Sequence, residues 1–205
     1  RSLGRIAARA AGARRITSAR GPALLSPRRV AIEFADSRSG AYSVTRATCL
    51  DPFPGCATCL RSFGSAEQGI ELLLTLIREG EALPPVYDLT RDFLERCVAG
   101  HPQALLPLFG FKLLTLLGSA PVAGDSHAGK TGWHPSAALT GILRSSTGSP
   151  LEAAGQYDDA TTAELKRFVH SLLGAELAAP LVSSGFVSRL SPGSTPITYA
   201  SGRVW

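Results

Sequence analysis

The most apolar run of the chain is Gln103-Ala-Leu-Leu-Pro-Leu-Phe-Gly-Phe-Lys-Leu-Leu-Thr-Leu-Leu-Gly118. On a helix over residues 103–117, apolar side chains would cover nearly every side, and Gly118 would end it, because glycine commonly follows the last helical turn. A helix that is apolar all round must be enclosed by other elements. We therefore predict that residues 103–117 form the buried centre of a helical bundle.

Further helices are expected on both sides of this segment. They are indicated by apolar stripes and end signals in residues 70–77, 88–98, 136–144, 159–173 and 186–190. Asp159 is predicted to cap the fourth of these helices, whose apolar residues recur at i, i+3, i+4 and i+7. Residues 119–135 and 148–156 are interpreted as a loop and a linker.

The N-terminal quarter has the pattern of strands. Val30-Ala-Ile-Glu-Phe34 and Tyr42-Ser-Val-Thr-Arg46 alternate apolar and polar residues, and Asp36-Ser-Arg-Ser-Gly40 between them is typical of a turn. This predicts a β-hairpin, with Phe34 in the core. Residues 5–9 fit either a strand or a frayed helix. The breakers in Asp51-Pro-Phe-Pro-Gly55 mark the expected domain boundary.

Together these patterns predict an α+β protein with residues 1–52 and 53–190 as its domains and 191–205 as a tail. An apolar fraction of 44% is typical of a globular chain with a real core. No stretch approaches the ~18 apolar residues that a membrane span requires, so we expect a soluble protein without a membrane partner. The chain begins at Arg1 and contains no methionine, which we interpret as processing or fragmentation.

The net charge of +5 is spread unevenly. Residues 1–32 hold eight arginines and no acid, whereas the rest of the chain has 13 basic against 16 acidic residues, a balance of −3. An acid-free arginine-rich arm on a mildly acidic body indicates a polyanionic partner, either nucleic acid or a membrane surface. The alternative is an organellar transit peptide, which has a similar composition.

Gly124-Asp-Ser-His-Ala-Gly-Lys-Thr131 matches the phosphate-loop pattern G-x-x-x-x-G-K-[ST]. A working phosphate loop joins a buried strand to a helix, so that backbone N–H groups point at the phosphates. Here Pro135 removes a donor and excludes His134 from a helix, and no strand precedes the motif. We therefore interpret this stretch as an exposed connector, and a nucleotide hydrolase that uses Lys130 is the least favoured function.

Metal and catalytic sites are also not expected. Cys56-Ala-Thr-Cys59 has metal-ligand or redox spacing, but zinc would need two further ligands, which Cys49 and Cys97 could supply only if the fold brought them close. Buried or incidental thiols are favoured. His127, His134 and Asp125 share a loop with irregular spacing, and the serines form no nucleophile motif. The sequence predicts a protein that is not an enzyme and holds no metal or cofactor.

The order of several motifs resembles the RecO family. They are Gly12-Ala-Arg-Arg-Ile-Thr-Ser18 with Leu24, Pro27 and the hairpin, then Glu71-Leu-Leu-Leu and Glu79-Gly-Glu, then Phe109 to Pro121, where Gly110 and Ser119 replace the family's Glu and Tyr. The resemblance covers roughly residues 4–190. It implies an OB-fold, here without its first strands, followed by a helical domain. The helical domain of the family often carries a four-cysteine zinc loop. Residues 122–160 contain no cysteine, so we expect no such loop in this chain.

The resemblance also implies a function without ATP. RecO-like proteins bind single- and double-stranded DNA, anneal complementary strands, and work with single-strand-binding protein and RecR in recombination. The first hypothesis is therefore a nucleic-acid-binding and strand-annealing protein whose helical domain docks protein partners. The alternative is a structural rRNA-binding subunit of an organellar ribosome, and a mitochondrial matrix location is favoured over the bacterial cytoplasm.

The candidate nucleic-acid contacts come from the arginine arm and the hairpin. The resemblance would place five arginines on OB strands or loops that face phosphate, namely Arg5, Arg9, Arg14, Arg15 and Arg20. Tyr42 is a better candidate for base stacking than Phe34. The candidate residues are Arg5, Arg9, Arg14, Arg15, Arg20, Arg28, Arg29, Arg38 and Tyr42. Single-stranded DNA and rRNA are both open as ligands, because the same basic surface serves either.

Overall fold

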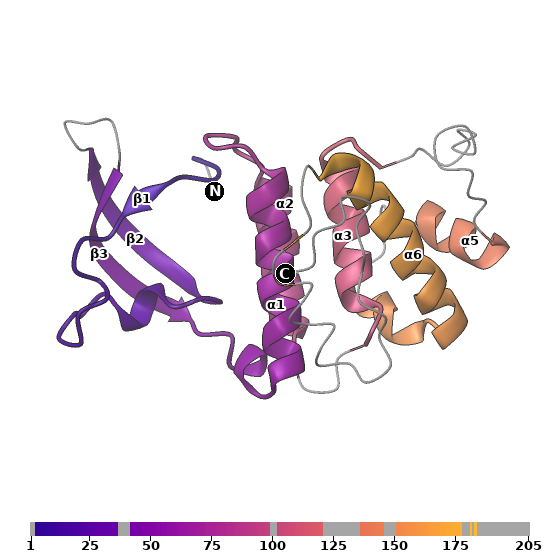
Figure 1. Cartoon of the computed structure of the whole chain (residues 1–205), viewed down its shortest axis with the longest axis horizontal. Coiled ribbons are helices and arrows are strands. Elements are labelled where there is room, and N and C mark those ends of the chain that lie inside the picture. Colours follow the sequence, from indigo (N-terminus) through magenta and orange to yellow (C-terminus); the bar gives the residue numbers. More distant parts are fainter. Residues whose placement is uncertain are drawn as a thin grey trace, which may run out of the picture.

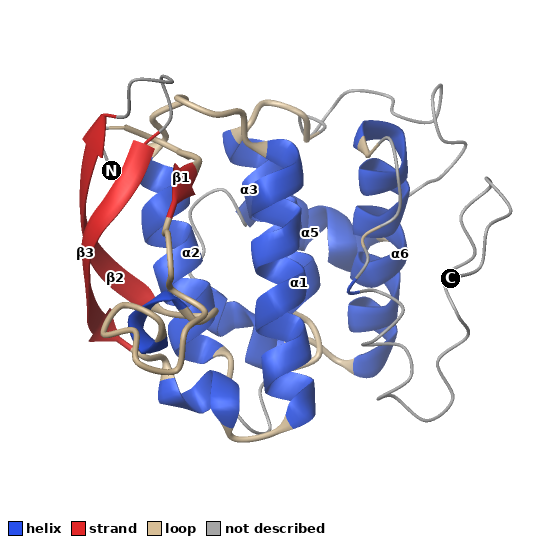
Figure 2. Ribbon diagram, turned by 60° about the vertical axis from the view of Figure 1, so that its left-hand side comes forward, coloured by secondary structure: helices blue, strands red, loops and turns tan. Residues whose placement is uncertain are grey.

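A computed structural model describes residues 3–36, 42–98, 102–120, 136–145 and 151–177, together with residues 181 and 183. A small sheet stands at one end of the molecule and the helices fill the rest (Figures 1 and 2). Strands followed by helices make an α+β fold, as predicted, in which partial OB-type strands precede a helical domain. Within the described ranges, no helix combines the length and apolar character needed to span a bilayer.

The sheet has three strands in the order β1-β3-β2. They are β1 (Ala8–Arg9), β2 (Arg29–Asp36) and β3 (Tyr42–Asp51). The predicted hairpin is the antiparallel pair β2–β3, and β1 pairs in parallel with β3, which identifies a strand within residues 5–9.

The prediction that Phe34 lies in the core is wrong. Phe34 is half-buried, Ile32 is exposed, and Val44 on β3 is the buried side chain of this sheet. The register shifts between Glu33 and Phe34, and such a bulge changes which residues share a face. Phe34 pairs with Val44 and so shares its face of the sheet, but it lies on the edge strand β2 and stays half-buried.

Five helices and three short 3-10 turns carry the rest of the described chain. The helices are α1 (Leu60–Leu76), α2 (Pro84–Arg96), α3 (Leu105–Leu116), α5 (Ala137–Ser145) and α6 (Asp159–Glu176), and the turns are η1 (Pro22–Leu24), η2 (Pro54–Ala57) and η3 (Leu151–Gln156). The predicted linker 148–156 thus contains a 3-10 turn, with Leu151 and Ala154 buried at the three-residue spacing of such a turn. The cap of α6 is Asp158 rather than Asp159. The predicted helix 186–190 lies outside the described residues.

Helix α3 is the buried centre of the bundle, as predicted. It lies among α1, α2 and α6 (Figure 1). Leu108, Phe109, Leu113 and Leu114 are all fully buried. The ring of Phe109 stacks on that of Phe93 from α2, with centroids 4.2 Å apart. The apolar stretch around Phe109 therefore organises the helical half of the protein.

Glycines let these helices approach closely. A Cβ at Gly69 on α1 would lie 2.3 Å from Cε1 of Phe93, so only glycine fits without a shift. A Cβ at Gly110 on α3 would lie 3.2 Å from Cγ1 of Val169 on α6. Even a Cβ at this buried position would require Val169 to give way by a few tenths of an ångström.

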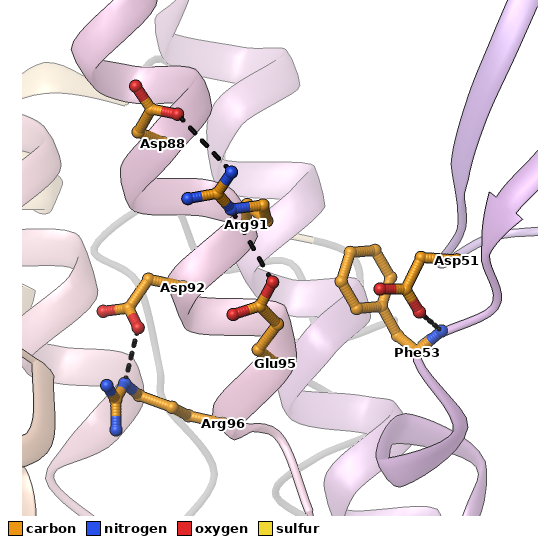
Figure 3. Close-up of polar contacts among 7 residues, drawn as sticks. All are labelled: Asp51, Phe53, Asp88, Arg91, Asp92, Glu95 and Arg96. Atoms are coloured by element: carbon orange, nitrogen blue, oxygen red, sulfur yellow. Dashed lines mark hydrogen bonds and ion pairs between the residues drawn. The ribbon is translucent and has the colours of Figure 1, made fainter.

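The sheet is joined to the helices at the breaker cluster that follows β3. Phe53 takes the left-handed conformation (φ 45°) with its ring buried, and its N–H donates to a carboxylate oxygen of Asp51 at 2.9 Å (Figure 3). The hydrogen bond and the buried ring together hold an unusual backbone conformation for a residue with a side chain. The turn η2 and helix α1 follow directly.

Candidate nucleic-acid interface

The segment that connects β1 to η1, residues 10–21, is here called the arginine loop. It lies at the sheet end of the molecule, away from α5 and α6 (Figure 1). Three short-range backbone hydrogen bonds fold it into successive turns: Ala13 N–H to Ala10 O at 3.2 Å, Arg15 N–H to Gly12 O at 3.1 Å, and Ser18 N–H to Arg15 O at 2.9 Å. These bonds give the loop a defined shape.

Arg20 ties this loop to the sheet. Its guanidinium donates to the carbonyl of Val44 on β3 at 2.5 Å and to the carbonyl of Ala11 at 2.9 Å. The Oγ of Ser18 accepts a hydrogen bond from Gly21 N–H at 3.1 Å, which closes the end of the loop. The two bonds that Arg20 donates hold the loop in place, and its predicted contact with phosphate stays a prediction.

Arg9, Arg14 and Arg15 have exposed side chains. Arg9 ends β1, opposite Ser43, and the other two follow in the arginine loop. Within the described residues, none of the three guanidinium groups makes a hydrogen bond or an ion pair with the protein. They are the arginines of the predicted set that are available to an anion in solvent, and they retain the forked donors suited to phosphate.

The other predicted arginines are engaged elsewhere. Arg5 donates to the carbonyls of Leu74 and Ile77, the latter at 2.7 Å, and thereby satisfies carbonyls at the C-terminal end of α1. Arg28 donates to the carbonyl of Pro22. Arg29 is half-buried. Arg38 lies outside the described residues.

Arg29 lies in the wall of an open apolar cavity. The cavity has a volume of about 280 Å³ and is otherwise lined by the N-terminal segment, Phe53, and helices α1 and α2. The Nε of Arg29 is buried and has no hydrogen-bond partner in the part of the chain that the structure describes. The position of Arg29 between sheet and helices separates it from the exposed arginines of the loop.

Tyr42 is half-buried rather than fully displayed. Its ring packs edge-on against Phe34, with centroids 4.8 Å apart and planes inclined by 65°. Tyr42 pairs with Ala8 of β1 in the sheet. The ring is therefore already engaged on one side, and its predicted role in base stacking stays a prediction.

Two arginines of α2 are paired with neighbouring acids. On α2, Arg91 lies 3.6 Å from a carboxylate oxygen of Glu95, and Arg96 lies 2.7 Å from Asp92 (Figure 3). Arg96 also pairs with Glu152 of η3 at 2.7 Å. These two arginines of α2 are therefore neutralised locally, in contrast to Arg9, Arg14 and Arg15 on the sheet side.

The cysteines divide into a buried pair and a cap. Cys56 and Cys97 are buried free thiols that contact each other, and this contact together with burial raises the pKa of Cys97. Cys59 is exposed and caps α1, where its sulfur accepts from Ser62 N–H at 3.4 Å. Hydrogen bonds from Ser62 lower the pKa of Cys59. In the described ranges, no cluster of three potential ligands could hold a metal ion.

The phosphate-loop match at residues 124–131 lies outside the described residues, as do Asp125, His127, Lys130 and His134. Its upstream context is described. Helix α3 ends at Leu116 and is followed by Gly118 in the left-handed conformation (φ 74°). The last helix or strand described before the motif is therefore a helix, and the description of the chain there ends at Ala120, whereas a working phosphate loop follows a strand.

The fold defines a class of α+β protein in which a partial OB-type sheet with a basic loop precedes a helical bundle centred on one apolar helix. Residues 60–171, more than half of the chain, match the family described as "Recombination protein O C terminal". The chain belongs to the RecO family. It is also 31% identical over 99 residues to the DNA repair protein RecO of Geobacter metallireducens, a match that covers 48% of this chain and 40% of that protein.

Proposed function

We propose that this protein is a non-enzymatic RecO-type protein of DNA repair and recombination that binds single-stranded nucleic acid and anneals complementary strands. Its family membership supports a role in repair and recombination. The observation that carries the binding proposal is the contrast between the exposed, unengaged arginines of the arginine loop and the paired arginines of α2.

Binding through this loop has a measurable electrostatic signature. Each phosphate that a protein neutralises on a single strand contributes about −0.7 to the slope of log affinity against log salt concentration. If Arg9, Arg14 and Arg15 each contact one phosphate, they contribute about −2 to that slope. Neutral replacements at Arg14 and Arg15 should therefore make the slope shallower by about 1.4 and weaken binding about 25-fold at 0.1 M salt.

The test is fluorescence anisotropy of a labelled oligothymidylate across a salt series. The wild-type protein is compared with Arg14→Gln/Arg15→Gln, and Arg91→Gln is the matched control, because Arg91 is paired with Glu95 on the helical half. The double variant should bind more weakly and show a shallower slope of log affinity against log salt concentration. The control should behave like wild type. Equal slopes for all three proteins would overturn the assignment of the loop.

Annealing is measured separately with two complementary oligonucleotides that carry a donor and an acceptor dye. Neutralising phosphates on both strands removes the repulsion that slows their encounter, so the wild-type protein should accelerate pairing. The double variant should accelerate it less. A protein that binds oligothymidylate and leaves the pairing rate unchanged would refute the annealing part of the proposal.

One further role belongs to the same proposal, and one alternative to the proposal is set against it. The helical half would dock protein partners, as the resemblance implies for the family. The alternative of a structural rRNA-binding subunit in an organellar ribosome finds no support among the comparisons, and the organellar location stays a prediction. Competition between single-stranded DNA and RNA of the same sequence distinguishes the two ligands.

A further inference from the structure

Ile16 is held out into solvent at the tip of the arginine loop. Its exposed fraction is 105%, whereas the next most exposed large hydrophobic residue of the described chain is Leu60 at 62%. Single exposed apolar residues are common on proteins. Ile16 differs from them in its surroundings, because it directly follows Arg14 and Arg15, whose side chains are also exposed.

The backbone of the loop fixes this position. The hydrogen bond from Ser18 N–H to Arg15 O closes a four-residue turn in which Ile16 occupies the first central place. Arg15 N–H is itself bonded to Gly12 O, so a first turn ends at Arg15 and Ile16 lies in the turn that directly follows it. Since Arg20 anchors the loop to Ala11 and to β3, the apolar tip is presented in a defined shape.

A matching partner offers anionic groups beside a narrow apolar slot. A single strand of nucleic acid has this chemistry, because its phosphates lie along an outer edge and its stacked bases open into apolar gaps. Proteins that bind the minor groove of a duplex frequently insert an isoleucine, leucine, methionine, phenylalanine or proline between base steps, use arginines alongside it, and so partially unstack the bases. One β-branched side chain is too small an apolar surface to anchor a protein stably on a bilayer.

We propose that Ile16 enters between two adjacent bases of a bound strand while Arg14 and Arg15 hold the flanking phosphates. This inference rests on the proposed nucleic-acid binding and adds a base contact to it. The wedge unstacks its two bases, which would leave their pairing edges open to a complementary strand. Ile16 thus contributes to how the strand is held, and the arginines contribute most of the affinity.

The experiment uses a single-stranded oligonucleotide with one 2-aminopurine among adenines, whose fluorescence rises when it is unstacked. Anisotropy of a second label on the same strand reports binding. Ile16→Ala is compared with wild type, and Leu60→Ala is the matched control, an exposed apolar residue at the start of α1. Both positions are at the surface, and equal melting temperatures establish that the fold is retained.

Wild type and Leu60→Ala should raise the fluorescence at saturation by several-fold, the response expected of one unstacked base. Ile16→Ala should still bind, within about tenfold of wild type since the phosphate contacts remain, and should lose most of the rise. If wild type binds and its fluorescence rise is absent, or persists in Ile16→Ala, the wedge is refuted and the proposed function stands. If wild type does not bind the strand, the proposed function fails first.

A second experiment tests whether Ile16 binds an anionic membrane surface. Sedimentation with phosphatidylserine vesicles should be unaffected by Ile16→Ala. Vesicle binding that depends on Ile16, together with an unchanged 2-aminopurine signal, would reassign the tip to a membrane surface and overturn the wedge.

Discussion

Replacing Gly69 by alanine should destabilise the protein, although alanine normally stabilises the interior of a helix. Gly69 lies within α1, and an added Cβ would be 2.3 Å from Cε1, 2.9 Å from Cζ and 3.2 Å from Cδ1 of Phe93. Phe93 has no exposed surface and is stacked on Phe109 at 4.2 Å. The ring cannot move away from α1 without disturbing the centre of the bundle.

The expected size follows from two opposing effects. Alanine in place of glycine favours a helix by about 1 kcal/mol. Overpacking of a filled core costs about 1–3 kcal/mol, and a contact of 2.3 Å with a confined ring belongs at the upper end of that range. The net loss of unfolding free energy is therefore about 1–2 kcal/mol, which for a chain of this length lowers the melting temperature by about 2–8 °C.

Urea unfolding followed by circular dichroism measures this change. Gly174→Ala is the control, because Gly174 lies on α6 and an added Cβ there meets nothing within 4 Å. The control should keep or raise the stability, by up to about 1 kcal/mol. If Gly69→Ala is as stable as Gly174→Ala, the close approach of α1 to Phe93 is wrong.

Two further predictions concern local hydrogen bonds. Arg5→Met should lower the unfolding free energy by about 1–3 kcal/mol, because it leaves the carbonyls of Leu74 and Ile77 at the end of α1 without their charged donor, and it should leave the salt slope of oligothymidylate binding unchanged. Hydrogen bonds from Thr161 lower the pKa of the Asp158 carboxyl. The ionised Asp158 therefore stabilises the folded state above the ordinary carboxyl pKa. This contribution disappears as the pH falls through the lowered pKa. Asp158→Asn, which keeps a capping oxygen and does not titrate, should therefore lose less stability than wild type between neutral and acid pH in urea unfolding, and an identical acid loss would contradict the cap.

Local periodicity was sufficient to predict the helices with long apolar side chains, and it failed where small residues are buried. Helix α1 begins at Leu60, ten residues before the apolar stripe that indicated it. Its first turns bury Ser62, Gly64, Ser65 and Ala66. Small residues carry little hydrophobic signal in a sequence, yet they are the ones that permit close helix contacts. The start of α1 is therefore set by tertiary packing that no local pattern records.

The sequence predicted which segment of the chain is basic, but not which contacts its individual arginines make. Counting charge located the basic arm in residues 1–32, and the exposed Arg14 and Arg15 lie within it. The roles of Arg5 and Arg20 could not be read from the sequence, because their carbonyl partners include Leu74, Ile77 and Val44, which are 24 to 72 residues away. A carbonyl is present at every residue, so no side-chain pattern marks it as a partner.

The exposed arginines of the arginine loop, Arg14 and Arg15, depend on Arg20, which is bonded to backbone carbonyls. A loop that carries several positive charges repels itself, and free arginine side chains lose conformational entropy when they bind a phosphate. Arg20 counters the first effect by binding carbonyl dipoles that hold the loop to β3. It also fixes the backbone from which Arg14 and Arg15 extend, so that less freedom is lost on binding. The proposed strand binding therefore depends on the contacts of Arg20 with Val44 and Ala11 as well as on the exposed guanidinium groups that would meet the phosphates.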